Sequence, residues 1–203
     1  VFAEFADAAL NLANVQLGQN VADIACGPGT LTSLLAERGA RVCAIDFSSR
    51  MLRILETNVA RDDLEGVSIH HGDGQALPFA DDQFDATFSL FGLIFFPDRE
   101  KGYTEMFRTL RAGGTAYVSS WAKLSLSPLF DVMAQTMTRL DPSRRPPTYD
   151  IGSLENPDVL SAEMRAAGFV DVTVNRVERE FVFSSAQQLW YGLANGSAPI
   201  AAM

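Results

Sequence analysis

The 203-residue sequence has few cysteines and no long apolar run. Cys26 and Cys43 are its only cysteines, and both lie in apolar stretches typical of buried strands. Neither a disulfide framework nor a zinc site is therefore indicated, and this cysteine usage fits a cytoplasmic protein. No apolar run approaches the length of about 20 residues that a helix needs to cross a bilayer, so we expect no membrane span.

Positive charge is also scarce, because 16 Lys and Arg residues face 25 Asp and Glu residues, which leaves a net charge of -9. A polyphosphate backbone would be repelled from most of such a surface, so nucleic acid is not expected as a substrate. Residues 1–10 have the pattern of an amphipathic helix rather than of a cleavable signal peptide, and we expect the natural N-terminus to lie upstream of Val1.

The apolar content of 47% and the chain length are typical of one globular domain, which we place at residues 1–203. Short runs rich in β formers alternate with segments of helical period from residue 21 onward. This pattern predicts an α/β fold with a mostly parallel sheet and helices on both faces. The expected strands are residues 21–25, 41–46, 67–71, 84–90 and 115–121, and Ser48, Asn156 and Ser185 are expected to cap helices.

The alternation loosens after residue 121. An apolar stripe of helical period over residues 126–140 leads into a proline-rich stretch at residues 141–147, which predicts an inserted cap or lid at about residues 123–155. Residues 170–183 are again rich in β formers and predict C-terminal strands. The chain stops at Met203, so we expect the last strand of a seven-stranded sheet to be missing from it.

A glycine-rich turn follows the first expected strand. Ligands of open parallel sheets bind beyond the carboxyl ends of the strands, and Gly27 and Gly29 let a ligand approach the backbone of this turn. Taken alone the turn does not distinguish between cofactors. The three-glycine pattern of dinucleotide sites is absent, so pyrophosphate binding is disfavoured.

Two acidic residues follow the next two strands. Asp46 lies at the distance along the chain at which a carboxylate reaches the ribose hydroxyls of a nucleoside, although it could also interact with the dipole of the following helix. Asp73, between Gly72 and Gly74, could accept a hydrogen bond from an adenine amine while a backbone amide donates to the ring. The alternative for Asp73 is an ordinary Asx turn.

Taken in order, residues 21–29, 45–46, 72–79 and 110–114 resemble the motifs of class I S-adenosylmethionine-dependent methyltransferases, in particular the quinone-biosynthesis methyltransferases and related small-molecule enzymes. The resemblance implies a Rossmann-like sheet of order 3-2-1-4-5, S-adenosylmethionine as cofactor and a small, partly apolar methyl acceptor. The residues that it places at the cofactor are Asp23, Ala25, Cys26, Gly27, Gly29, Asp46, Phe47, Met51, Gly72, Asp73, Gly74, Phe88 and Ser89.

The resemblance implies that the turn would approach the methionine part and the ribose, that Phe47 and Met51 would border the adenine, and that Phe88 and Ser89 would lie beside the sulfonium. The sequence departs from the family at Ala25, where glycine is frequent, and at residues 90–98, which lack the histidine found there in many members. No catalytic residue is assigned, since His70 and His71 fall on the adenine side, and Asp98 and Tyr103 are weaker candidates.

The aromatic residues Phe88, Phe91, Phe95 and Phe96 could line an acceptor pocket or could simply belong to the core. Two other functions stay open at this point. One is a nicotinamide-dependent oxidoreductase, which would need a third glycine and a hydride site that the sequence does not supply. The other is a non-catalytic module that binds the cofactor or forms a homodimer through the apolar stripe at residues 126–140.

Overall fold

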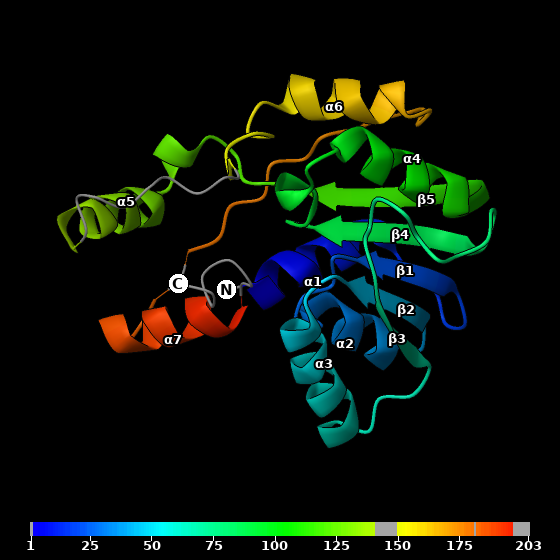
Figure 1. Cartoon of the computed structure of the whole chain (residues 1–203), viewed down its shortest axis with the longest axis horizontal. Helices are drawn as coiled ribbons and strands as arrows, with labels where there is room; N and C mark the ends of the chain where they lie inside the picture. Colours follow the sequence, from blue (N-terminus) through cyan, green and yellow to red (C-terminus); the bar gives the residue numbers. More distant parts are fainter. Residues whose placement is uncertain (1, 141–149, 181, 197–203) are drawn as a thin grey trace.

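The computed structural model describes residues 2–140, 150–180 and 182–196. Within them lies a five-stranded, all-parallel sheet of order β3-β2-β1-β4-β5, with a reversal of strand order between β1 and β4 (Figure 1). This arrangement confirms the predicted fold class and strand order. The strands are β1 (Asn20–Ile24), β2 (Arg41–Asp46), β3 (Val67–His71), β4 (Phe84–Leu90) and β5 (Leu110–Ser119).

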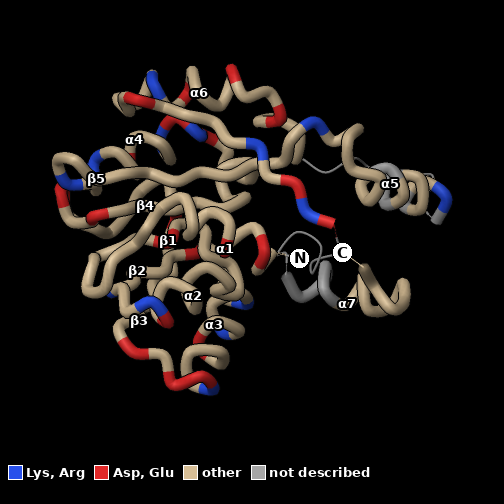
Figure 2. Tube along the Cα trace, turned by 180° about the vertical axis from the view of Figure 1, so that it is seen from behind, with Lys and Arg blue, Asp and Glu red and all other residues tan. Residues whose placement is uncertain are grey.

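Helices cover both faces of the sheet, as the alternating pattern predicts. The helices are α1 (Phe2–Ala13), α2 (Thr30–Glu37), α3 (Ser49–Arg61), α4 (Arg99–Thr109), α5 (Pro128–Leu140), α6 (Pro157–Ala166) and α7 (Ala186–Gly196), with the short 3-10 turns η1 (Leu93–Phe95) and η2 (Leu124–Leu126). Figure 1 shows α4 and α6 along the β4–β5 half of the sheet, and α5 and α7 away from it. Helix α7 carries no charged residue (Figure 2).

The predicted helix caps form. Ser48 Oγ accepts a hydrogen bond from Met51 N at 3.4 Å, and Asn156 Oδ1 accepts one from Asp158 N at 2.9 Å. Ser185 Oγ likewise accepts from Gln188 N at 3.1 Å. Each bond satisfies a backbone donor that the first turn of the helix leaves without a partner.

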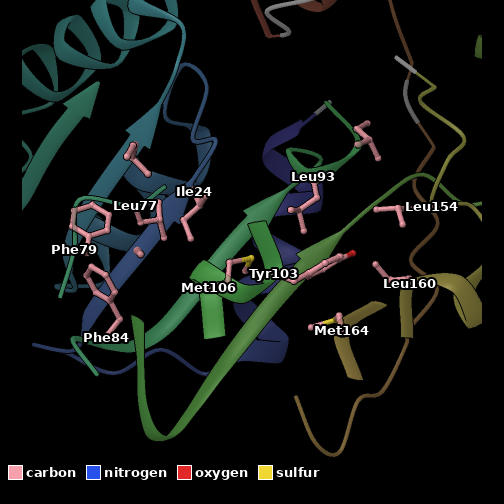
Figure 3. Close-up of a cluster of buried hydrophobic side chains, with 13 residues drawn as sticks. Ile24, Leu77, Phe79, Phe84, Leu93, Tyr103, Met106, Leu154, Leu160 and Met164 are labelled. Carbon is pink, nitrogen blue, oxygen red and sulfur yellow. The ribbon is translucent and has the colours of Figure 1, made fainter. Parts of the chain in front are cut away.

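Two apolar layers enclose the sheet. On one face, α1 and α2 pack against side chains such as Val21 and Phe88. On the other face, α4 and α6 pack around Tyr103 and Met164, together with Phe84 and Ile24 from the strands (Figure 3). Full burial of each of these large apolar side chains stabilises the fold by about 1.5–3 kcal/mol.

Two strand predictions need correction. Strand β5 spans Leu110–Ser119 rather than residues 115–121, because Leu110 already pairs with Phe84 and, after a bulge, the pairing resumes between Thr115 and Ala86. The C-terminal strands expected at residues 170–183 are wrong for the described residues, which form no strand there. Alternating apolar residues form a strand only where a sheet buries one face, whereas Val170 and Val182 are 82% and 91% exposed.

The cap or lid expected at residues 123–155 is described in part. Helix α5 carries most of the apolar stripe, and Leu154 returns to the core, where it is 2% exposed. The proline-rich residues 141–147 and the chain end at residues 201–203 lie outside the described residues, so the lid and the missing last strand stay predictions. None of the helices in the described part of the chain is both long and apolar enough to cross a membrane.

Candidate functional site

The chain leaves β1 through a turn with three residues in the left-handed region: Ala25 at φ 57°, Gly27 at φ 56° and Gly29 at φ 86°. Cys26 N donates to Ile45 O at 3.1 Å, which ties this turn to the end of β2. A residue with a Cβ pays about 1–2 kcal/mol for this conformation, which accounts for the frequent glycine at the position of Ala25 in the resembling family.

The two glycines of the turn have different surroundings. A Cβ added to Gly27 would meet no atom within 4 Å, whereas one added to Gly29 would overlap the buried side chain of Leu55 in α3. Gly29 therefore allows α3 to pack against the turn. Gly27 leaves open space over its backbone, as the approach of a ligand requires.

Asp46 joins the turn to the start of α3. Its Oδ2 accepts from Gly27 N and its Oδ1 from Ser48 N, both at 2.8 Å. The side chain is only 7% exposed, and burial raises the pKa of the carboxyl although both backbone donors oppose the rise. Each carboxylate oxygen has a second lone pair, so the group can still accept from two vicinal hydroxyls.

Asp23 lies beneath the turn and presents almost no surface. Its Oδ2 accepts from Thr32 Oγ1 of α2 at 2.6 Å, and the residue is 2% exposed. Burial raises the pKa of this carboxyl to about 7, with a smaller contribution from the charge of Asp46, while the bond from Thr32 lowers it. The role supported by these contacts is to hold α2 on β1.

This raised pKa predicts a pH-dependent stability. Folded protein binds more protons at Asp23 than unfolded protein does between pH 3.8 and about 7, so the stabilisation falls as pH rises through this window. We expect Asp23→Asn to flatten the profile. The difference in unfolding free energy between variant and wild type should change by at most about 4 kcal/mol across this pH window. Urea unfolding of both proteins from pH 4 to 8 measures that difference, and a constant difference would contradict the prediction.

The expected adenine side lies at the ends of β2 and β3. Phe47 is 71% exposed, and its carbonyl oxygen is 2.8 Å from Nε2 of His71. Met51, by contrast, is buried in the layer below. Only Phe47 of this pair presents a surface on which a planar ring could stack.

Asp73 is exposed and forms the Asx turn considered as an alternative, since its Oδ1 accepts from Gln75 N at 2.9 Å. The neighbouring glycines lie in contact with other elements. A Cβ on Gly72 would come within 3.0 Å of Ile45, and one on Gly74 would overlap the ring of Phe96. The Asx turn leaves lone pairs of Asp73 available for a ligand.

At the end of β4 the structure separates two predicted site residues. The ring of Phe88 is fully buried and stacks on Tyr117 with centroids 4.8 Å apart, so its side chain contributes to the core. Ser89 Oγ is buried without a hydrogen-bond partner among the described residues. A Cβ on Gly92 would lie 2.6 Å from both Ala25 Cβ and Ser89 Oγ, so the loop after β4 packs directly on the glycine turn.

Five partly exposed rings gather beside this loop and form what we term the aromatic cluster: Phe2, Phe5, Phe91, Trp121 and Phe130. The Phe91 and Trp121 centroids are 4.5 Å apart. Phe91 holds φ at 57°, an unusual conformation for a bulky residue and one found at functional sites.

Only Phe91 of this cluster is among the residues that the sequence indicated as a possible acceptor pocket. The other rings come from α1, α5 and the end of β5, which only the fold brings together. A usable signal was the position of Trp121 just after a strand adjacent to β4, since parallel strands end at the same edge. Phe95 and Phe96 instead pack against the core, as the alternative interpretation held.

None of the four residues considered as a general base belongs to the aromatic cluster. The His70 ring packs on Phe79, and His71 contacts the carbonyl of Phe47, so both lie on the β3 side. Asp98 caps α4 through Lys101 N, while Tyr103 is fully buried and burial raises its pKa. Within the described residues, no group of three or more His, Cys, Asp or Glu could hold a metal ion.

Comparison with known proteins shows which family has this arrangement. A family model described as a methyltransferase domain matches residues 21–114. Over 167 residues the chain is 32% identical to a demethylmenaquinone methyltransferase of Clavibacter sepedonicus, covering 76% of this chain and 67% of that protein. The chain belongs to the class I S-adenosylmethionine-dependent methyltransferases. The cofactor of this methyltransferase is S-adenosylmethionine.

A second demethylmenaquinone methyltransferase, from Thermobifida fusca, is 38% identical over 112 residues, which cover 55% of this methyltransferase and 48% of the relative. The alignments thus span about half to two thirds of the length of these relatives. An S-adenosylmethionine-dependent methyltransferase from Aquifex aeolicus has the same fold, with a TM-score of 0.62 at 17% identity, covering 80% of this chain and 78% of its own.

Proposed function

We propose that this chain transfers a methyl group from S-adenosylmethionine to a small, partly apolar molecule. The observation that carries the proposal is the Asp46 carboxylate, held by Gly27 N and Ser48 N beside a turn with open space over Gly27. A site for a nucleoside needs a hydrogen-bond acceptor for the ribose hydroxyls, and beside it a stretch of backbone that the ligand can approach closely.

The residues present fit the cofactor. We assign the ribose hydroxyls to Asp46, the face of the adenine to Phe47, and its edge to Asp73 with the amide of Gly74. We assign the methionine part to the backbone of Ala25, Cys26 and Gly27, near the buried Ser89 Oγ, which has no hydrogen-bond partner among the described residues and lies with Ala25 against Gly92. Four further residues support this surface from behind through their packing or hydrogen bonds, namely Asp23, Gly29, Met51 and Phe88.

The cofactor supplies a methyl group that is already activated on a sulfonium. The chain's own task is then to orient the acceptor and to exclude water. The aromatic cluster lies where β4 and β5 end, and its partly exposed rings offer an apolar surface for the acceptor. We assign no general base.

The other two functions are less well supported. A nicotinamide-dependent oxidoreductase lacks its third glycine, and a non-catalytic module lacks support from the relatives, which are named as methyltransferases. A homodimer and a cytoplasmic location stay predictions.

The test combines binding with turnover. Purified protein is titrated with S-adenosylhomocysteine by calorimetry and then incubated with S-adenosylmethionine and a panel of phenols, quinols, amines and thiols. We expect binding in the micromolar range, typical of cofactor sites, and methylated product by mass spectrometry with at least one apolar acceptor. Absence of binding, or binding without transfer to any of them, would count against the proposal.

Trp121→Ala tests the acceptor surface. We expect the KM for the acceptor to rise about tenfold, because a large aromatic contact is lost, while affinity for S-adenosylhomocysteine stays unchanged. Trp190→Ala, which removes a half-exposed indole from α7, is the matched control. Equal effects of the two variants, or a parallel loss of cofactor affinity in Trp121→Ala, would place the acceptor elsewhere.

A further inference from the structure

Gln75 makes a bridge that the cofactor assignments do not use. It lies between β3 and β4, directly after the Asp73 turn, and is partly buried. Its Nε2 is 3.0 Å from both Oδ1 and Oδ2 of Asp73, and its Oε1 is 2.8 Å from Asp98 N. One amide side chain thus contacts both the carboxylate expected at the adenine and the residue that caps the N-terminus of α4.

Chemistry permits only one orientation of this amide. The Asp73 carboxylate can only accept hydrogen bonds and the Asp98 backbone N–H can only donate, so the NH2 group must face Asp73 and the oxygen must face Asp98. Hydrogen bonds to an ionised group are stronger than those between neutral groups. The bridge therefore adds a second restraint to an exposed carboxylate, whose Oδ1 already accepts from Gln75 N in the Asx turn.

A second contact joins the same two loops. The ring of Phe96, in the loop that follows β4, lies against Gly74 and against Gly102 of α4, where an added Cβ at either glycine would meet the ring. The polar bridge and this apolar contact together fasten the loop after β3 to the loop after β4. The first loop carries Asp73, and the second carries Phe91 of the aromatic cluster.

We propose that Gln75 is a positioning residue, which orients Asp73 for the adenine edge and links that orientation to the loop that leads from the aromatic cluster to α4. The inference rests on the proposed function, because it takes Asp73 as the group that reads the adenine. Orienting the carboxylate before the ligand arrives raises affinity, since the ordering is not required on binding.

Two substitutions separate the ends of the bridge. Gln75→Met removes both ends. Gln75→Glu keeps an acceptor for Asp98 N but places a negative charge against Asp73. We expect each to weaken binding of S-adenosylhomocysteine about tenfold by calorimetry, as for loss of hydrogen bonds to a charged group. Gln83→Met is the control, because Gln83 Oε1 caps a turn at Ala80 N in the same connection, away from Asp73.

The rate of amide hydrogen exchange at Asp98 reports on the second end of the bridge, the hydrogen bond from Asp98 N to Gln75 Oε1. Exchange should speed up in Gln75→Met, which loses the acceptor, and stay as in the wild type in Gln75→Glu, although both bind the ligand less tightly. In an Asp73→Asn background, Gln75→Met should weaken binding less than twofold, since the charge that Gln75 restrains is gone.

The outcomes distinguish failure of the positioning role of Gln75 from failure of the proposed function. Failure of the unaltered protein to bind S-adenosylhomocysteine overturns both. Binding that Asp73→Asn weakens but both Gln75 variants leave unchanged overturns only the positioning role. If Gln75→Glu bound S-adenosylhomocysteine with wild-type affinity while Gln75→Met bound it more weakly, only the bond to Asp98 N would matter for binding. That result would also overturn the positioning role.

Discussion

We expect replacement of Asp46 by alanine to abolish detectable binding of S-adenosylhomocysteine. Replacement by asparagine should weaken binding about a hundredfold, the loss expected for two hydrogen bonds to a charged group. Both carboxylate oxygens already accept from backbone N–H groups of Gly27 and Ser48. An asparagine has only one oxygen, so one of these donors would face an NH2 group. The variant therefore disturbs the turn as well as the contact with ribose.

Calorimetry with S-adenosylhomocysteine measures this loss, and thermal unfolding shows how much of it comes from a weaker fold. Asp62→Asn is the matched control, because Asp62 follows the same helix α3 and pairs only with its exposed neighbour Arg61 in the described structure. If Asp46→Asn bound S-adenosylhomocysteine with wild-type affinity, Asp46 would not be the residue that binds the ribose hydroxyls.

Adding a methyl group to each glycine of the turn should give opposite results. Gly29→Ala should destabilise the fold by about 2–4 kcal/mol, from the left-handed conformation and from overlap with Leu55 in a packed layer. Gly27→Ala should cost only about 1 kcal/mol of stability, since open space surrounds the new Cβ. It should nevertheless weaken S-adenosylhomocysteine binding at least about tenfold, because the methyl group occupies the approach to the backbone.

Urea unfolding and calorimetry on both variants test this contrast. Leu55→Ala provides a further control, because it removes the side chain that a Cβ at Gly29 would meet. The double variant Gly29→Ala/Leu55→Ala should be less destabilised than the sum of the two single variants. Similar stability losses for Gly27→Ala and Gly29→Ala, or full binding by Gly27→Ala, would contradict the assignment of separate roles.

Local patterns predicted most of the scaffold. Strands β2, β3 and β4 begin and end at the predicted residues, and the caps at Ser48 and Asn156 form as expected. These features depend on neighbours within a few residues along the chain, such as apolar alternation or a side-chain oxygen near the first helical amides. The order of the motifs likewise sufficed to indicate the cofactor.

Longer-range packing decided the rest. Residues 170–180 carry a strand-like pattern, but a strand also needs the free edge of a sheet to pair with. In the structure these residues form no strand. Gly27 and Gly29 look alike in the sequence, yet only the position of Leu55 shows which one is open to a ligand. The aromatic cluster draws on residues more than a hundred positions apart, which no sequence window relates.

The sequence by itself determined the family, the parallel sheet and the acidic residues that follow its strands, because these depend on short motifs and local periodicity. Only the tertiary structure decided which of those residues present a surface, which ones support it from below, and that Gln75 joins Asp73 to α4. Burial and contact are properties of the packed chain. They become defined only when distant segments occupy the same space.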